Sequence, residues 1–158
     1  MEPRLNLLGT PVVAKALKHF ASASRTLITE SSLPRTIQDL VMLRSSQING
    51  CGYCTDVHSK DLLHAGESTT RVNLVAAWRE SSVFTDAERA ALELAEQGTR
   101  IADGAGGVTD EAWANAAKHF DEEQLAVLVA FIAIINSSNR LGVINRIPGG
   151  NYTPGDFG

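Results

Sequence analysis

Two cysteines and a histidine lie close enough together in this sequence to carry out redox chemistry. Cys51 and Cys54 are the only cysteines of the chain, and His58 follows four residues after the second. A C-x-x-C spacing in a reducing compartment indicates redox or metal chemistry. If a helix begins at about Cys51, positions 51, 54 and 58 lie within about 60° of one another around its axis. Both thiols and the imidazole would then share one helix face.

This shared face favours a nucleophilic thiolate. A thiol in the first turn of a helix meets the positive end of the helix dipole and unpaired N–H groups, which lower its pKa. His58 lies one turn after Cys54, and the usual histidine pKa near 6.5 suits a base that accepts the thiol proton. We therefore predict that Cys51, Cys54 and His58 are catalytic.

Helix geometry adds a carboxylate to these three residues. A helix that ends at Asn49 and Gly50 would run antiparallel to the helix that carries the cysteines. Two residues, one from each helix, would then lie opposite each other at the same height along the hairpin when their numbers sum to about 99. Asp39 is level with position 60, within about half a turn of His58. We expect Asp39 to orient the imidazole and to hold its proton.

The whole chain is predicted to be all-α. Apolar residues recur at helical spacing almost everywhere, and alternating runs rich in β-branched residues are missing. We expect a single compact domain over residues 1–158 with six to seven helices. Its centre would be an antiparallel hairpin of helices 34–49 and 51–65, which Gly50 closes in a left-handed conformation.

The remaining elements follow from capping and breaking residues. Thr85 and Glu88 form one capping box, and Asp121 and Gln124 form another. We expect further helices at 11–24, 68–80, 85–101, 109–120 and 121–147, and a loop at 103–107. The tail at 148–158 is rich in Gly and Pro and should be extended, with Tyr152 and Phe157 as anchors.

Composition argues against several classes of partner. The net charge is -4 and the sequence contains no cluster of Lys and Arg. This argues against binding to nucleic acid or to anionic membrane surfaces. The N-terminus shows no secretory apolar segment, so we expect a cytoplasmic protein. The longest apolar run, 125–135, is about half of the ~20 residues that a membrane-spanning helix needs, and it is interpreted as a core helix.

Several other residues receive structural interpretations. Trp78 and Trp113 occupy apolar helical positions and are expected in the core. The acidic residues of 85–96 are expected on a solvated face. Helix caps or a subunit interface are expected for five polar residues near the end of the last helix: Asn136, Asn139, Arg140, Asn145 and Arg146.

The sequence around the cysteines resembles a known family. The run 39–58 is similar to the core motif of the alkylhydroperoxidase D-like branch of the carboxymuconolactone decarboxylase family. Segments 76–80 and 84–92, together with Asn136 and Arg140 and their neighbours, are also similar, so that the resemblance covers residues 35 to 155.

The resemblance implies roles for the site residues. Cys54 would attack a hydroperoxide, Cys51 would resolve the sulfenic acid as a disulfide, and His58 and a glutamate would relay protons. Asp39 stands at the glutamate position and is one methylene shorter, so its contact with His58 is expected to be long or water-bridged. The family implies an external dithiol reductant, no cofactor, no metal and a homo-oligomer, in which we expect the tail to lie across a neighbour.

Two alternatives remain open from the sequence. The wider family includes decarboxylases and other lyases that act on lactone acids, but that chemistry does not require a C-x-x-C pair. A non-catalytic assembly or zinc module could use Cys51, Cys54 and His58, with His64 or a carboxylate as a fourth ligand. A single helix face presents four ligands poorly around a tetrahedron.

Overall fold

Helices account for all the regular secondary structure in the part of the chain that the structure describes, residues 2–104 and 106–155. In this computed structural model, no strand occurs among those residues, which confirms the all-α prediction. The elements are η1 (Leu7–Gly9), α1 (Pro11–Glu30), α2 (Arg35–Asn49), α3 (Gly52–His64), α4 (Thr69–Leu74), η2 (Val75–Glu80), α5 (Asp86–Thr99), α6 (Asp110–Ala116) and α7 (Glu122–Asn145), where η marks a 3-10 helix.

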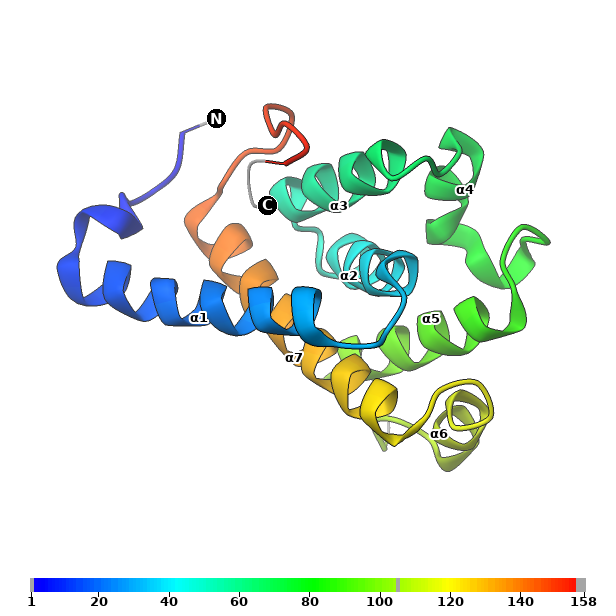
Figure 1. The fold of residues 1–158 in the computed structure, drawn as a ribbon. Coiled ribbons are helices and arrows are strands. Elements are labelled where there is room, and N and C mark those ends of the chain that lie inside the picture. Colours follow the sequence, from blue (N-terminus) through cyan, green and yellow to red (C-terminus); the bar gives the residue numbers. More distant parts are fainter. Residues whose placement is uncertain (1, 105, 156–158) are drawn as a thin grey trace.

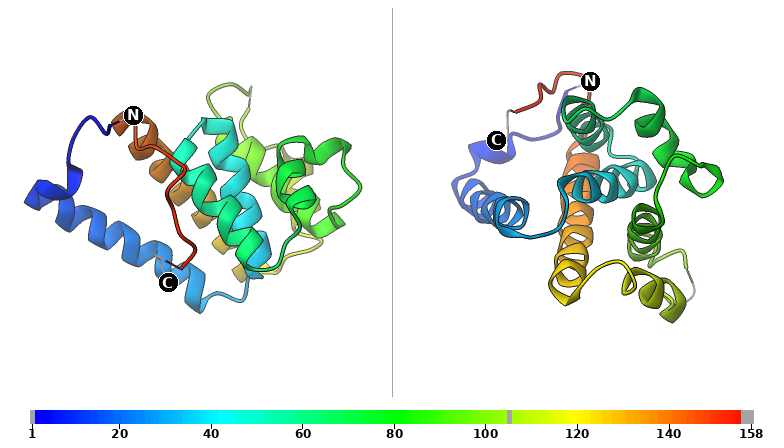
Figure 2. Two further views of the ribbon diagram at one scale, coloured as in Figure 1. Left: turned by 90° about the horizontal axis from the view of Figure 1, so that it is seen from above. Right: turned by 45° about the vertical axis from the view of Figure 1, so that its right-hand side comes forward.

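Helix α2 forms the centre of the molecule. Helices α3, α5 and α7 surround it, and α1 runs along the outside next to α7 (Figures 1 and 2). One apolar cluster fills the space between α2, α5 and α7 and includes Val41, Leu94 and Phe131. A second cluster on another side of α2 includes Leu43 and Leu62. Burial on several sides explains why α2 carries nine buried residues.

The predicted hairpin of α2 and α3 is confirmed. Gly50 ends α2 in the left-handed region, with φ of 66°, and the Cys51 amide donates to the Ser46 carbonyl at 3.0 Å. Helix α3 then returns beside α2 (Figure 2). Glycine takes a positive φ without the steric cost that a Cβ adds, so Gly50 permits the tight turn that brings Cys51 to the start of α3.

Helix α7 is the longest helix and crosses beneath α2 (Figure 1). By length and composition alone it could span a membrane. In the structure Leu128 and Phe131 of this helix are fully buried in the first apolar cluster. The interpretation of 125–135 as part of a core helix is therefore confirmed.

Some helix boundaries differ from the sequence expectation. Helix α1 continues past residue 24 to Glu30, because no Gly or Pro interrupts the chain before Pro34. Helix α6 ends at Ala116 rather than near 120, because the amides of Lys118 and His119 bond to carbonyls three residues back instead of four. The expected helix 68–80 is divided into α4 and η2, with a non-helical conformation at Ala77. Both predicted capping boxes are present.

Candidate functional site

The two cysteines form a disulfide at the start of α3. Their Cα atoms lie 5.4 Å apart. Cys51 is the N-cap residue of α3, and its sulfur accepts a hydrogen bond from the Cys54 amide at 3.3 Å. Both residues are buried. The pair is thus an oxidised dithiol, positioned where amide groups of a helix terminus can stabilise negative charge on sulfur.

Two glycines allow other segments to approach this pair. A Cβ at Gly142 of α7 would lie 2.8 Å from the Cys51 sulfur and 3.7 Å from the Cys54 sulfur. A Cβ at Gly149, in the tail, would lie 2.5 Å from the Gly52 carbonyl oxygen. Neither glycine was identified from the sequence. The available signal was an isolated glycine inside the most apolar helix, which often marks close packing.

Buried amides join α7 to the end of α2. The Asn49 side-chain amide donates to the side-chain oxygens of Asn136 and Asn139, each at 2.9 Å. Asn139 in turn donates to the Ser46 hydroxyl at 3.0 Å, and Asn136 donates to the Thr99 hydroxyl at 3.1 Å. The expectation of helix caps or a subunit interface is therefore wrong for Asn136 and Asn139, which connect helices within one chain.

His58 and Asp39 face each other, at the height that helix geometry predicts. The distance from His58 Nδ1 to Asp39 Oδ1 is 3.9 Å, which is too long for a hydrogen bond. Both atoms are buried and neither forms a hydrogen bond with the described residues. The other oxygen, Asp39 Oδ2, accepts a hydrogen bond from Arg35 Nε at 2.7 Å. A long contact is what the shorter aspartate side chain led us to expect.

Burial changes the proton affinity of both groups. Burial, aided by the positive charge of Arg35, lowers the pKa of His58 from 6.5 to about 3. The ordinary pKa assumed from the sequence is therefore wrong for this disulfide form. Burial raises the pKa of Asp39, Arg35 opposes that rise, and the nearby carboxylate of Asp61 adds to it. His58 is thus neutral at pH 7 and able to accept a proton, and an adjacent thiolate would favour its charged form.

Asp61 joins this pair and gives a donor set of mixed type. One ligand atom from each of Asp39, His58 and Asp61 lies within 4.8 Å of the other two. Imidazole and carboxylate oxygens are donors that Zn²⁺ accepts. However, the Arg35 guanidinium already occupies Asp39 Oδ2 and places positive charge next to any cation there. The zinc set considered from the sequence is not assembled in this form, because the two sulfurs are bonded to each other.

The tryptophan predictions have different outcomes. Trp78 is buried, as predicted, whereas Trp113 is 44% exposed. Helical periodicity places Trp113 on the apolar side of α6 but does not show whether another element covers that side. Its side chain lines a cavity of about 490 Å³ between α5, α6 and α7, together with Val129 and Ile132.

The acidic residues of 85–96 do not form a simple solvated face. Glu88 is buried and pairs with Arg71 at 2.6 Å. Glu96 pairs with Arg44 at 2.7 Å and accepts a hydrogen bond from the Trp78 indole at 3.0 Å. The prediction is wrong for these two residues because arginines from other elements approach α5.

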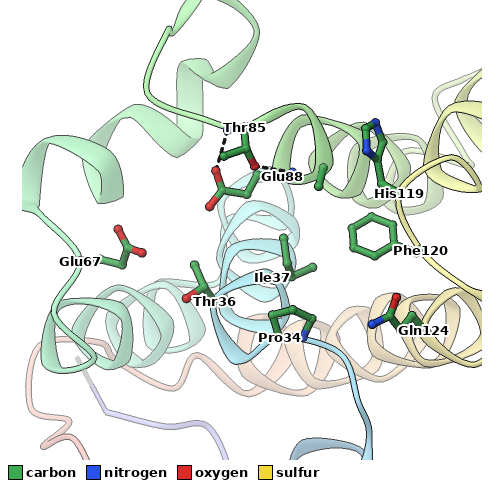
Figure 3. Close-up of a pocket in the computed structure, with 10 residues that line it drawn as sticks. Pro34, Thr36, Ile37, Glu67, Thr85, Glu88, His119, Phe120 and Gln124 are labelled. Carbon is green, nitrogen blue, oxygen red and sulfur yellow. Dashed lines mark hydrogen bonds between the residues drawn. The ribbon is translucent and has the colours of Figure 1, made fainter.

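A second cavity, of about 360 Å³, lies between the starts of α2 and α5 and the end of α6 (Figure 3). Figure 3 shows Glu88 hydrogen-bonded to Thr85 in the capping box, with His119 and Phe120 to the right of this pair. Neither this cavity nor the cavity beside Trp113 is lined by a cysteine, by His58 or by Asp39. The redox pair therefore lies apart from both.

Sequence comparison places the chain among known proteins. The profile of the "Carboxymuconolactone decarboxylase family" matches residues 11–97. The uncharacterized protein YdfG of Bacillus subtilis is 40% identical over 114 residues, which cover 72% of this chain and 76% of that protein. The uncharacterized protein YnjA of Escherichia coli is 34% identical over 118 residues, which cover 75% of this chain and 63% of that protein.

Solved structures show the same fold. A protein of unknown function from Agrobacterium tumefaciens, described as a candidate antioxidant defence protein AhpD, has a TM-score of 0.87 and 32% identity, and covers 96% of this chain and 100% of that one. The debrominase Bmp8 in complex with 2,3,4-tribromopyrrole has a TM-score of 0.74 and 22% identity, and the match covers 87% of this chain and 71% of that one. The latter likeness shows the fold alone.

The sequence match, the helical fold and the paired cysteines agree with one another. This chain belongs to the carboxymuconolactone decarboxylase family, in its alkylhydroperoxidase D-like branch.

Proposed function

We propose that this protein is a thiol-dependent peroxidase that reduces hydroperoxides through Cys54 and Cys51, with His58 as the base and Asp39 as its partner. The observation that carries the proposal is the disulfide at the start of α3, one helix turn before a buried histidine that faces a carboxyl group. The lyases of the wider family do not require such a pair, so a formed disulfide favours redox chemistry over decarboxylation.

The reaction has three steps. The Cys54 thiolate attacks the terminal oxygen of a hydroperoxide, the O–O bond breaks, and the alcohol leaves with the proton that His58 took from the thiol. This gives a sulfenic acid on Cys54. The Cys51 thiol then attacks that sulfur, the S–S bond forms, and water leaves. An external dithiol supplies two electrons and two protons and restores both thiols.

The order of attack depends on two competing features. Cys51 is the N-cap residue, and its sulfur accepts a hydrogen bond from the Cys54 amide, which favours a thiolate on Cys51. Cys54 has His58 one turn later, and it is 6% exposed where Cys51 is 1% exposed. Cys51 also lies closest to the α7 backbone at Gly142. We assign the attack to Cys54, because a base and access to substrate are both needed for the first step.

Single cysteine variants test the function and the order together. Cys54→Ser should abolish peroxide consumption, and Cys51→Ser should permit one attack and accumulate sulfenic acid on Cys54. Thiol titration before and after a small excess of hydroperoxide, followed by mass spectrometry of the peptide that contains both cysteines, measures each state. Sulfenic acid on Cys51 in the Cys54→Ser protein would reverse the order, and unchanged thiols in the wild type would refute the function.

We also propose that the protein is a cytoplasmic homo-oligomer. Helix α1 has no buried residue, and the end of α7 exposes Leu141, Val143 and Ile144. A second copy could cover these apolar side chains. The tail was expected to clamp a neighbour, but its described part packs on α3 of its own chain, and Phe157 lies outside the described residues.

Light scattering coupled to gel filtration tests the assembly. The full-length protein should run as an oligomer at micromolar concentration, and Ile144→Glu should shift it toward smaller particles. Ser59→Ala, a small change on α3, is the control and should leave the mass unchanged. A monomeric wild type at that concentration would refute the proposed assembly.

A further inference from the structure

The C-terminal tail is attached to the helix that carries the cysteines. Asp56 of α3 accepts hydrogen bonds from the amides of Gly150 and Tyr152 at 2.7 and 3.1 Å. Lys60, one turn later, donates to the carbonyl oxygens of the same two residues at 3.2 and 2.9 Å and pairs with Asp56 at 2.8 Å. Figure 1 shows the tail, in red, beside the start of α3. These bonds fix the backbone on both sides of position 151.

This attachment delivers a hydroxyl group to the acid–base residues. Tyr152 is 8% exposed, and its hydroxyl donates to Asp61 Oδ1 at 2.8 Å. Asp61 lies with Asp39 and His58 in one cluster, within 4.8 Å. The tail therefore contacts a carboxylate that lies next to both members of the proposed acid–base pair.

We propose that Asp61 and Tyr152 are positioning residues for the His58–Asp39 pair, and that the C-terminal tail is therefore part of the catalytic site. The inference rests on the proposed peroxidase function. Neither residue touches the reacting sulfurs in this assignment. Tyr152 holds the Asp61 carboxylate in place, and Asp61 acts on Asp39 through its charge.

The charges around Asp39 explain how this would operate. Arg35 of α2 contacts Asp39 Oδ2 and favours the ionised carboxylate, whereas the negative charge of Asp61 opposes it. Asp39 thus lies between a cation and an anion, opposite His58. If Asp61 were neutral, Arg35 would keep Asp39 ionised to lower pH. With Asp61 charged and held by Tyr152, Asp39 accepts a proton more readily, as a relay partner of His58 must.

Two conservative substitutions test the proposal. Asp61→Asn removes the charge and retains the shape, and Tyr152→Phe removes the hydroxyl and retains the ring. The Asp39 carboxyl ¹³C titration, followed by NMR, should move to lower pH in Asp61→Asn, because a negative charge that disfavours the ionised carboxylate is removed, and should move by less in Tyr152→Phe. The acid limb of the pH profile of peroxide consumption should move in the same direction. Asp110→Asn, which removes an exposed carboxylate from α6, a helix that packs on α5, should change neither.

The two readouts separate this inference from the proposed function. If the wild type does not consume peroxide but the Asp39 titration moves as expected, the function fails and the positioning role stands. If the wild type consumes peroxide and neither variant moves the titration or the pH profile, the positioning role is overturned while the function stands. A shift to higher pH in Asp61→Asn would also overturn it.

Discussion

The two ends of the site are built differently. The sulfur end (Cys51, Cys54 and Gly142) is closely packed, since even one additional carbon at Gly142 would clash with sulfur. The acid–base end (Asp39, His58 and Asp61) is also buried, but it contains two facing polar atoms that form no hydrogen bond with the described residues. Packing fixes where the disulfide forms, whereas the atoms that we propose to exchange protons have hydrogen-bonding capacity left for that task.

Among changes at the two ends of the site, removal of the His58 imidazole should have the largest effect on activity. We expect His58→Ala to reduce the rate of peroxide consumption by about 10²- to 10⁴-fold, the usual contribution of a general base. Oxidation of the dithiol by a small disulfide reagent should still go to completion, because the sulfur end is intact. His64→Ala, on the same helix, is the matched control. An equal loss in both variants would show that His58 acts only through the fold.

The buried imidazole should also make the fold sensitive to acid. Between pH 6.5 and about 3 the unfolded chain binds a proton at His58 that the folded chain does not, so the free energy of unfolding decreases as pH falls. From pH 7 to pH 5 the loss is about 2 kcal/mol, since the slope rises to about 1.36 kcal/mol per unit below pH 6.5. The raised pKa of Asp39 acts in the opposite direction: the folded protein binds a proton there more readily than the unfolded chain, so this group adds stability as pH falls through its raised pKa.

Urea denaturation at pH 7 and pH 5 measures this difference. His58→Gln should lose less stability between the two pH values than the wild type, because it has no proton to bind. An equal or larger loss in the variant would contradict a neutral, buried His58 in the folded protein.

A methyl group at the sulfur end should destabilise the oxidised protein. Gly142→Ala places a Cβ 2.8 Å from the Cys51 sulfur, and overpacking of this kind costs about 1–3 kcal/mol. The higher helix propensity of Ala returns up to about 1 kcal/mol. Urea denaturation should show a larger loss for the disulfide form than for the reduced form, where the thiols can rotate. Ser137→Ala, on the exposed side of α7, raises the helix propensity and removes only a hydrogen bond within the helix, and a gain in Gly142→Ala equal to that of this control would contradict the close packing.

The smallest change in activity is expected from a longer side chain at position 39, in the acid–base end. Asp39→Glu restores the residue type of the resembling family and can close the 3.9 Å distance to His58. We predict that kcat/KM for a hydroperoxide is equal to or moderately higher than that of the wild type. A large loss would show that the pocket is built around the shorter side chain and that protons travel by another route.

Local signals allowed much of the fold and part of the site to be predicted. Gly50 marked the hairpin, and the constant rise of a helix then placed Asp39 level with His58. Both predictions involve residues near one another in the sequence. The contact between Gly142 and Cys51 joins residues far apart in the chain, and no periodicity within α7 specifies which of its faces meets the sulfurs.

The environment of each side chain was harder to predict than its position. The low pKa of His58 results from burial and from Arg35, which depend on how helices pack. Trp113 was assigned to the core from its helical position, yet no described element covers it fully. Glu88 was assigned to solvent, although Arg71 from another element reaches it. A single sequence shows the apolar side of a helix but not which neighbour covers it.

The buried asparagines of α7 have a consequence for how the native arrangement is selected. Leucines and isoleucines permit one helix to slide along another with little energetic difference, but amides in an apolar interior tolerate few alternatives. Asn136 and Asn139 both meet Asn49, two residues before Cys51. A slip of α7 by one residue would leave these amides unpaired and rotate a bulky side chain, Leu141 or Val143, toward the sulfurs. The hydrogen bonds of these amides thus fix the register of α7 against α2, so that the single glycine of α7 lies against the cysteines.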